Sequence, residues 1–213
     1  GIGGTISKIK SSENFNSTIK VIILGEGLTS RSKERNTIKW EKELAIHQKN
    51  IQQAKKILGY DLLKTYNLPD NRFDTIPLLD IIKLIEIEKK EFKPDIVFTH
   101  DYIDLNIDHK RTNQAVLTAF RPFKNDTTKL MLTFETPSST EWNFNESFIP
   151  NFFIELEEKY INKKIKAMGC YEYEKREAPH PRSPVSLRNL AISRGNKIGV
   201  EFAEAFKITR LVI

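Results

Sequence analysis

The sequence has little of several residue types that define whole classes of protein. Its 213 residues include one cysteine, Cys170, and four histidines. A single thiol excludes a disulfide framework and a cysteine-based zinc site, and it fits a reducing compartment such as the cytoplasm. No apolar run approaches the roughly 20 residues that a membrane-spanning helix needs. We therefore expect a cytoplasmic globular protein without a membrane span.

The positive charge also has no focus along the chain. The net charge is +6, yet Lys and Arg are interleaved with Asp and Glu, and no basic run reaches five residues. Nucleic-acid binding needs positive charge gathered on one face. We therefore expect no nucleic-acid partner. The sequence leaves the oligomeric state open, a homo-oligomer included.

Strand-like and helical patterns alternate along the chain. Apolar β-branched runs predict strands, and apolar residues at three- and four-residue spacing predict helices. The strands are expected at 18–25, 62–68, 94–99, 129–135, 152–156 and 206–213, and the helices at 40–58, 75–92, 107–120, 157–174, 187–194 and 200–205. This order implies βαβ units. We expect one domain over residues 1–213, a three-layer α/β/α sandwich on a mainly parallel, Rossmann-like sheet.

The richest chemistry follows the predicted strand at 94–99. The loop after it holds imidazoles, carboxylates and an amide: His100, Asp101, Asp104, Asn106, Asp108 and His109. Parallel α/β proteins place their active sites at the carboxyl ends of strands, and imidazoles with carboxylates suit a hydrolytic metal site there.

The roles within this loop have alternatives. His109 is the candidate metal ligand, and Asp108 is a candidate for orienting an imidazole. The alternative is a plain helix N-cap, with Asp104 or Asn106 capping the helix and His109 in its first turn. His100 either stands near the site or only closes a strand.

Four further residues are candidates for substrate binding. Arg72 follows a strand and either holds a sugar hydroxyl or phosphate or forms a surface salt bridge. His180 and Arg182 lie in a proline-stiffened loop suited to lining a pocket. Trp142 either stacks on a sugar ring or packs like any other aromatic residue.

Five segments together resemble the PIG-L family of zinc-dependent N-acetylglucosaminyl deacetylases, also called LmbE-like. They are Gly25–Arg31, Leu68–Thr75, Asp104–His109, Phe134–Trp142, and His180–Ser183 followed by Leu190–Gly195. The resemblance covers nearly the whole chain in order. It implies a Zn²⁺-dependent hydrolase that removes the acetyl group from an N-acetylglucosamine-type sugar or its conjugate. The resemblance also implies that His109 is a zinc ligand and that Asp108 belongs to the acid–base and orienting network. His100 and Asn106 are further candidates for the catalytic network.

The sequence departs from the family pattern in two places. Family members carry Ala-His-Pro-Asp-Asp-Glu shortly before a segment similar to Gly3-Gly-Thr-Ile6, and no His-Pro-Asp-Asp occurs here. We expect that the sequence is N-terminally incomplete, and that the chain as it stands is inactive because two metal ligands are missing. Asn106 also stands where many relatives have histidine, and it cannot titrate near neutrality. The alternative is a non-enzymatic carbohydrate-binding or accessory protein with a degenerate site.

Overall fold

The computed structural model describes residues 1–12, 16–124 and 126–213. The chain forms two compact units, each built from segments that are distant in sequence. The first unit comprises Gly1, residues 71–152 and residues 205–213; the second comprises residues 2–70 and 153–204. A single domain over residues 1–213 stays a prediction.

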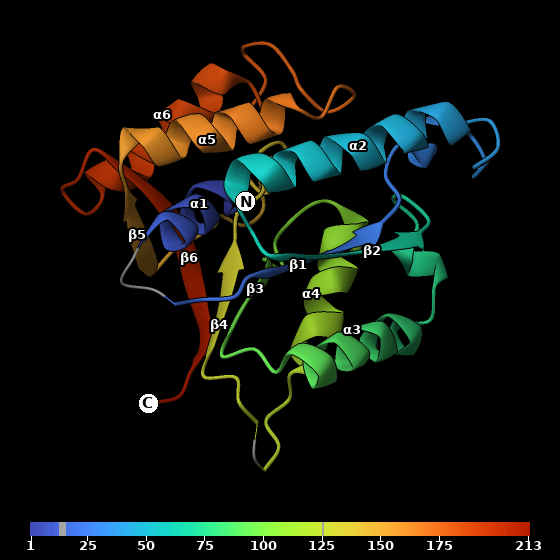
Figure 1. Cartoon of the computed structure of the whole chain (residues 1–213), viewed down its shortest axis with the longest axis horizontal. Coiled ribbons are helices and arrows are strands. Elements are labelled where there is room, and N and C mark those ends of the chain that lie inside the picture. The colour runs from blue at the N-terminus through green and yellow to red at the C-terminus, as the bar shows by residue number, and fades with distance from the viewer. Residues whose placement is uncertain (13–15, 125) are drawn as a thin grey trace. The chain divides into compact units, whose positions relative to one another are not determined.

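The first unit joins a mixed sheet to two helices that contact each other (Figure 1). Its elements are η2 (Phe73–Thr75), α3 (Leu78–Phe92), β3 (Ile96–His100), α4 (Ile107–Ala119), β4 (Leu130–Phe134) and the greater part of β6 (Phe202–Leu211). Strand β3 pairs in parallel with β4 from Ile96↔Leu130 to His100↔Phe134. Strand β6 pairs with β4 in the antiparallel direction.

The second unit is mainly helical. Its elements are α1 (Gly3–Ser11), β1 (Lys20–Gly25), η1 (Thr29–Arg31), α2 (Glu41–Leu58), β2 (Leu62–Leu68), β5 (Phe152–Leu156), α5 (Glu158–Gly169) and α6 (Pro184–Asn196). Strands β1 and β2 pair in parallel. Helix α5 contacts α1, α2 and α6, so it is the central helix of this unit. Buried Leu156, Tyr160, Ile161, Ala191 and Phe202 form an apolar cluster there.

The sheet corrects the prediction of a mainly parallel arrangement. The described strands form a two-stranded sheet, β1-β2, and a four-stranded sheet in the order β3-β4-β6-β5, in which β4 and β6 run antiparallel. The fold is therefore mixed α/β, and the three-layer arrangement stays a prediction.

The predicted helix at 200–205 is also wrong. Residues 202–205 are buried at the start of β6. Alanine and glutamate favour a helix in isolation, but tertiary pairing in a buried strand overrides that local preference. Two smaller differences are that Pro77 is the N-cap of α3, outside the helix itself, and that α5 ends at Gly169.

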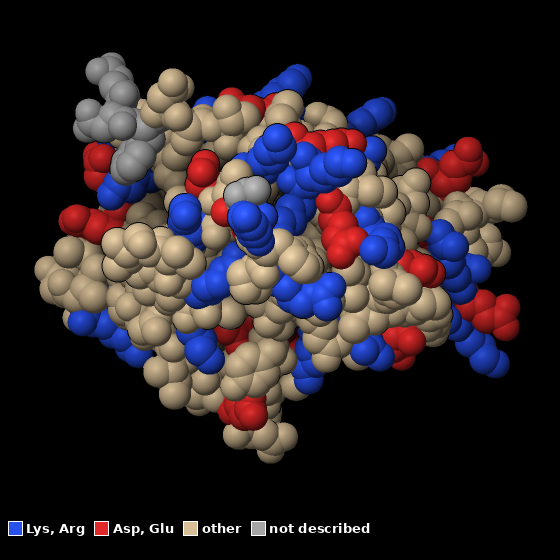
Figure 2. All heavy atoms as spheres, turned by 90° about the horizontal axis from the view of Figure 1, so that it is seen from below, with Lys and Arg blue, Asp and Glu red and all other residues tan. Residues whose placement is uncertain are grey.

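On the face drawn in Figure 2, Lys and Arg side chains lie among Asp, Glu and uncharged residues. Among the described residues, no helix is both long enough and apolar enough to cross a bilayer.

Candidate functional site

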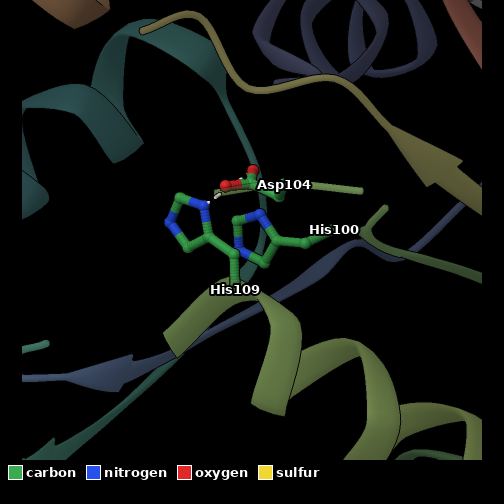
Figure 3. A group of neighbouring side chains, drawn as sticks. All are labelled: His100, Asp104 and His109. Atoms are coloured by element: carbon green, nitrogen blue, oxygen red, sulfur yellow. Dashed lines mark hydrogen bonds and ion pairs between the residues drawn. The ribbon is translucent and has the colours of Figure 1, made fainter. Parts of the chain in front are cut away.

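The end of β3, the loop after it and the start of α4 bring three polar side chains together in the first unit. His100 is the last residue of β3, Asp104 lies in the connecting loop, and His109 lies in the first turn of α4. One nitrogen or carboxylate oxygen from each lies within 4.8 Å of the others. Figure 3 shows the two imidazole rings side by side, with the Asp104 carboxylate close to His109.

The carboxylate of Asp104 sets the tautomer of His109. Asp104 is fully buried, and its Oδ2 lies 2.8 Å from Nδ1 of His109. Burial alone would raise the pKa of Asp104, but hydrogen bonds from His109, Ser139 and the N–H of Asn106, together with the charge of His109, outweigh it and lower the pKa to about 2. An ionised carboxylate only accepts hydrogen bonds, so Nδ1 must donate. In the neutral imidazole, the other nitrogen, Nε2, then carries the lone pair that can bind a ligand.

The remaining partners of Asp104 come from the segment after β4 and from the backbone of its own loop. The hydroxyl of Ser139 donates a short hydrogen bond to Oδ1, and Thr140 Oγ1 lies 3.4 Å from Oδ2. The backbone N–H of Asn106 also donates to Oδ1, at 2.9 Å. These hydroxyl residues were missed by the sequence analysis. Their signals in the sequence are the polar run Thr136-Pro-Ser-Ser-Thr140 after a buried strand and the segment Phe134–Trp142, which carries part of the family resemblance.

His100 lies against His109 in an arrangement that limits its role. The two rings are parallel within 5°, with centroids 3.8 Å apart. His100 Nδ1 lies 3.2 Å from Thr136 Oγ1. Burial, followed by the nearby charge of His109, moves the pKa of His100 well below its usual value. His100 is therefore a neutral ring at physiological pH.

The stacking of the His100 and His109 rings limits how the cluster could bind a single metal ion. A metal bound by an imidazole lone pair lies in the plane of that ring. Because the planes of His100 and His109 are parallel and stacked, an ion in the plane of one lies outside the plane of the other. The donor types fit zinc. In this arrangement, however, His109 is a candidate ligand, His100 packs against it, and Asp104 orients it.

Asn106 is the N-cap of α4, as one of the sequence alternatives proposed. Its side-chain oxygen accepts hydrogen bonds from the N–H groups of Asp108, at 2.8 Å, and His109, at 3.2 Å. Its amide nitrogen donates to Asn71 Oδ1 at 3.0 Å. The cap fixes the first turn of the helix and with it the position of His109. A catalytic role for Asn106 stays a prediction.

Asp108 has partners different from those expected. Its carboxylate accepts hydrogen bonds from the backbone N–H groups of Asn71, at 2.7 Å, and Phe73, at 3.0 Å. These two residues flank Arg72, so Asp108 fixes the loop that carries it. The carboxylate that orients the imidazole of His109 is Asp104, which the sequence analysis considered only as a cap.

The other predicted binding residues are divided between the units. Arg72 and Trp142 belong to the first unit, where the Trp142 side chain is 43% exposed and Asn143, next to it, donates from Nδ2 to the carbonyl of Ile103. His180 and Arg182 belong to the second unit. There, His180 Nδ1 accepts a hydrogen bond from the N–H of Arg182 at 3.1 Å. Binding of substrate by these four residues stays a prediction.

Comparison with known families gives one match. A family model described as PIG-L: GlcNAc-PI de-N-acetylase matches residues 1–120, more than half of the chain. A comparison with curated proteins finds no match.

Solved structures share the fold at low sequence identity. The N,N'-diacetylchitobiose deacetylase from Pyrococcus horikoshii has a TM-score of 0.73 and 20% identity, over 99% of this chain and 78% of that one. The 4-carboxy-2-hydroxymuconate hydratase from Pseudomonas putida has a TM-score of 0.71 and 17% identity, over 99% and 90%. A zinc-inhibited form of teicoplanin deacetylase has a TM-score of 0.74 and 12% identity, over 97% and 91%.

Proposed function

The chain belongs to the PIG-L family, and we propose that it is a zinc-dependent hydrolase that removes the N-acetyl group from an N-acetylglucosamine-type sugar or its conjugate. The observation that carries the proposal is the hydrogen bond between His109 Nδ1 and Asp104. It leaves Nε2 for a metal, and an imidazole held by a carboxylate is a common arrangement at zinc sites. The cytoplasm, suggested by the single cysteine, is the proposed location.

The chain's own residues would hold and orient one metal ligand. Asp104 fixes the tautomer and direction of His109, and Asn106 fixes the helix turn on which His109 lies. His100 packs against one face of the His109 ring. A bound zinc would supply polarisation of the amide carbonyl and a lowered pKa of a water molecule. A catalytic zinc normally uses three protein ligands, so we expect its other ligands to lie outside this cluster.

The similar structures support this choice of reaction without deciding it. The Pyrococcus protein is an N,N'-diacetylchitobiose deacetylase, and deacetylation is the reaction class proposed here. The hydratase from Pseudomonas has the same fold and a different reaction. One fold can host several chemistries, so the substrate must be established by assay.

A second candidate is a carbohydrate-binding or accessory protein without catalysis. The stacking of His100 on His109 favours it, because this arrangement provides a single imidazole ligand. Such a protein would bind an N-acetylated sugar with no bound zinc and no acetate release.

The test uses the complete gene product with added Zn²⁺. We would measure bound zinc by titration calorimetry and acetate release from N-acetylglucosamine and N,N'-diacetylchitobiose. The deacetylase predicts one zinc per chain and acetate release, both abolished in His109→Ala. His47→Ala, which removes a buried histidine from the second unit, is the matched control and should keep both. Sugar binding without zinc or acetate release would establish the second candidate in place of the first.

A further inference from the structure

The second unit contains a pair of arginines joined through one carboxylate. Arg31 Nη2 donates to Glu174 Oε1 at 2.6 Å, and Arg182 Nη1 donates a short hydrogen bond to the other oxygen, Oε2. Arg31 lies in η1, after the carboxyl end of β1, whereas Arg182 lies in the loop before α6. Two segments far apart in the chain therefore bring their guanidinium groups to the same side chain.

The two guanidiniums keep unused hydrogen-bond donors. Each guanidinium has five N–H donors in a planar fork. Within the described residues, Arg31 uses only Nη2, which also donates to the Tyr173 carbonyl at 2.8 Å, and Arg182 uses only Nη1. Arg182 Nε is buried and has no hydrogen-bond partner among the residues that the structure describes. Buried donors are normally satisfied, so an unused one calls for a ligand, an ion or water.

The charge balance favours an anion. Glu174 neutralises one of the two positive charges, and Arg176, whose Nη1 also donates to the Tyr173 carbonyl, adds a third guanidinium nearby. Asp70 accepts hydrogen bonds from the N–H and hydroxyl of Ser30, which precedes Arg31, so it is a second carboxylate near the pair. Three guanidinium groups are then set against two carboxylates. The side chains of Arg31 and Arg182 are 34% and 24% exposed, so solvent reaches both.

We propose that Arg31 and Arg182 form a binding site for a small anion, either a phosphate or a carboxylate, within the second unit. Both anions present several oxygen acceptors to which guanidinium forks bind in two-pronged fashion. Glu174 holds the two arginines in place when the site is empty and competes with the bound anion. The proposal concerns the second unit alone and does not depend on the function of His109.

The test is calorimetric titration of the complete protein with inorganic phosphate and, separately, with succinate at low ionic strength. We expect saturable binding of one of them; phosphate alone would identify a phosphate site and succinate alone a carboxylate site. Arg31→Ala and Arg182→Ala should each weaken it at least about tenfold, the effect of losing charge-assisted hydrogen bonds. Glu174→Gln should tighten it about tenfold, because a competing negative charge is removed.

The controls separate this site from general charge and from the candidate metal site. Arg188 is 33% exposed and paired with Glu158 in the same unit, so Arg188→Ala should leave the affinity unchanged. His109→Ala should also leave it unchanged. Absence of saturable binding by either anion, or equal losses in Arg182→Ala and Arg188→Ala, would overturn the proposal. The Glu174→Gln result guards against misfolding, since a tighter site cannot come from a damaged protein.

Discussion

Two buried carboxylates, one in each unit, make a comparison between a structural cluster and a candidate site. Asp104 is fully buried and accepts hydrogen bonds from His109, Ser139 and Asn106. Glu204, 6% exposed, accepts from the N–H groups of Gly4, at 3.0 Å, and Thr5, at 2.7 Å, and from Lys164 Nζ, at 2.7 Å. Both acids are ionised, because in each case these donors outweigh the effect of burial on the pKa.

The difference lies in what the donors have left to offer. The donors of Glu204 are backbone N–H groups at the start of α1 and an ammonium, so the cluster joins a helix terminus to β6 and α5. None of these groups has a lone pair for a ligand. His109 does, because its Nε2 stays available when Nδ1 binds Asp104. A buried charge indicates a candidate site only when its partner keeps an atom that can bind something else.

The largest effect is expected on the free energy of unfolding, from loss of the structural carboxylate Glu204. Glu204→Ala removes the carboxylate that binds Lys164, whose side chain is 13% exposed, and the acceptor for two backbone N–H groups. Loss of one member of a buried ion pair costs about 3–5 kcal/mol of unfolding free energy. Urea denaturation would measure it. The double variant with Lys164→Met should lose less than the two single losses added. A loss below about 1 kcal/mol would mean that Glu204 has no structural role.

The second prediction concerns how the stabilisation by Asp104 depends on pH. Its pKa is lowered to about 2 in the folded protein from its ordinary value of 3.8. The stabilisation is therefore complete above pH 3.8 and is lost as the pH falls through about 2. The shift corresponds to about 2 kcal/mol. Unfolding free energies of the wild type and Asp104→Asn should differ at pH 6 and converge toward pH 2. A difference that is constant with pH would contradict this.

The sequence predicted the elements better than their partners. Periodicity located β2 and β5 at the predicted bounds and α2 to within a residue, because each is a local pattern ended by turn residues such as Gly59. Strand direction is not local. The antiparallel pairing of β4 with β6 joins residues 72 to 81 positions apart, from Leu130↔Leu211 to Phe134↔Phe206. The local helix preference of residues 200–205 hid the start of β6.

The same limit applies to the candidate site. His109, Asn106 and His100 were chosen as candidates because they lie within ten residues of one another after one strand. Asp104 lies in the same loop, yet its role depends on Ser139 and Thr140, more than 30 positions away. Asp108 was chosen for its position beside His109, whereas its carboxylate binds the backbone of Asn71 and Phe73. Neighbours in sequence suggest a site, and the fold assigns the roles within it.

The last prediction changes ligand binding and tests the functional side of the comparison directly. Asp104→Asn should lower the zinc affinity of the complete gene product by about 10- to 100-fold, the usual effect of losing a carboxylate that orients a metal-binding histidine. The amide can still accept the hydrogen bond, but it carries no charge to favour the required tautomer. Titration calorimetry with Zn²⁺, in buffer where every variant is folded, would measure the change.

Two matched variants decide what that change means. Asp101, in the same loop, is 1% exposed and accepts hydrogen bonds from the Ile103 N–H and the Thr133 hydroxyl, so Asp101→Asn removes a buried charge without touching His109. Glu204→Gln does the same in the second unit. Both should reduce stability and leave zinc affinity unchanged. If all three variants weaken zinc binding equally, the effect of Asp104 is one of general stability, and the distinction between the two carboxylates fails.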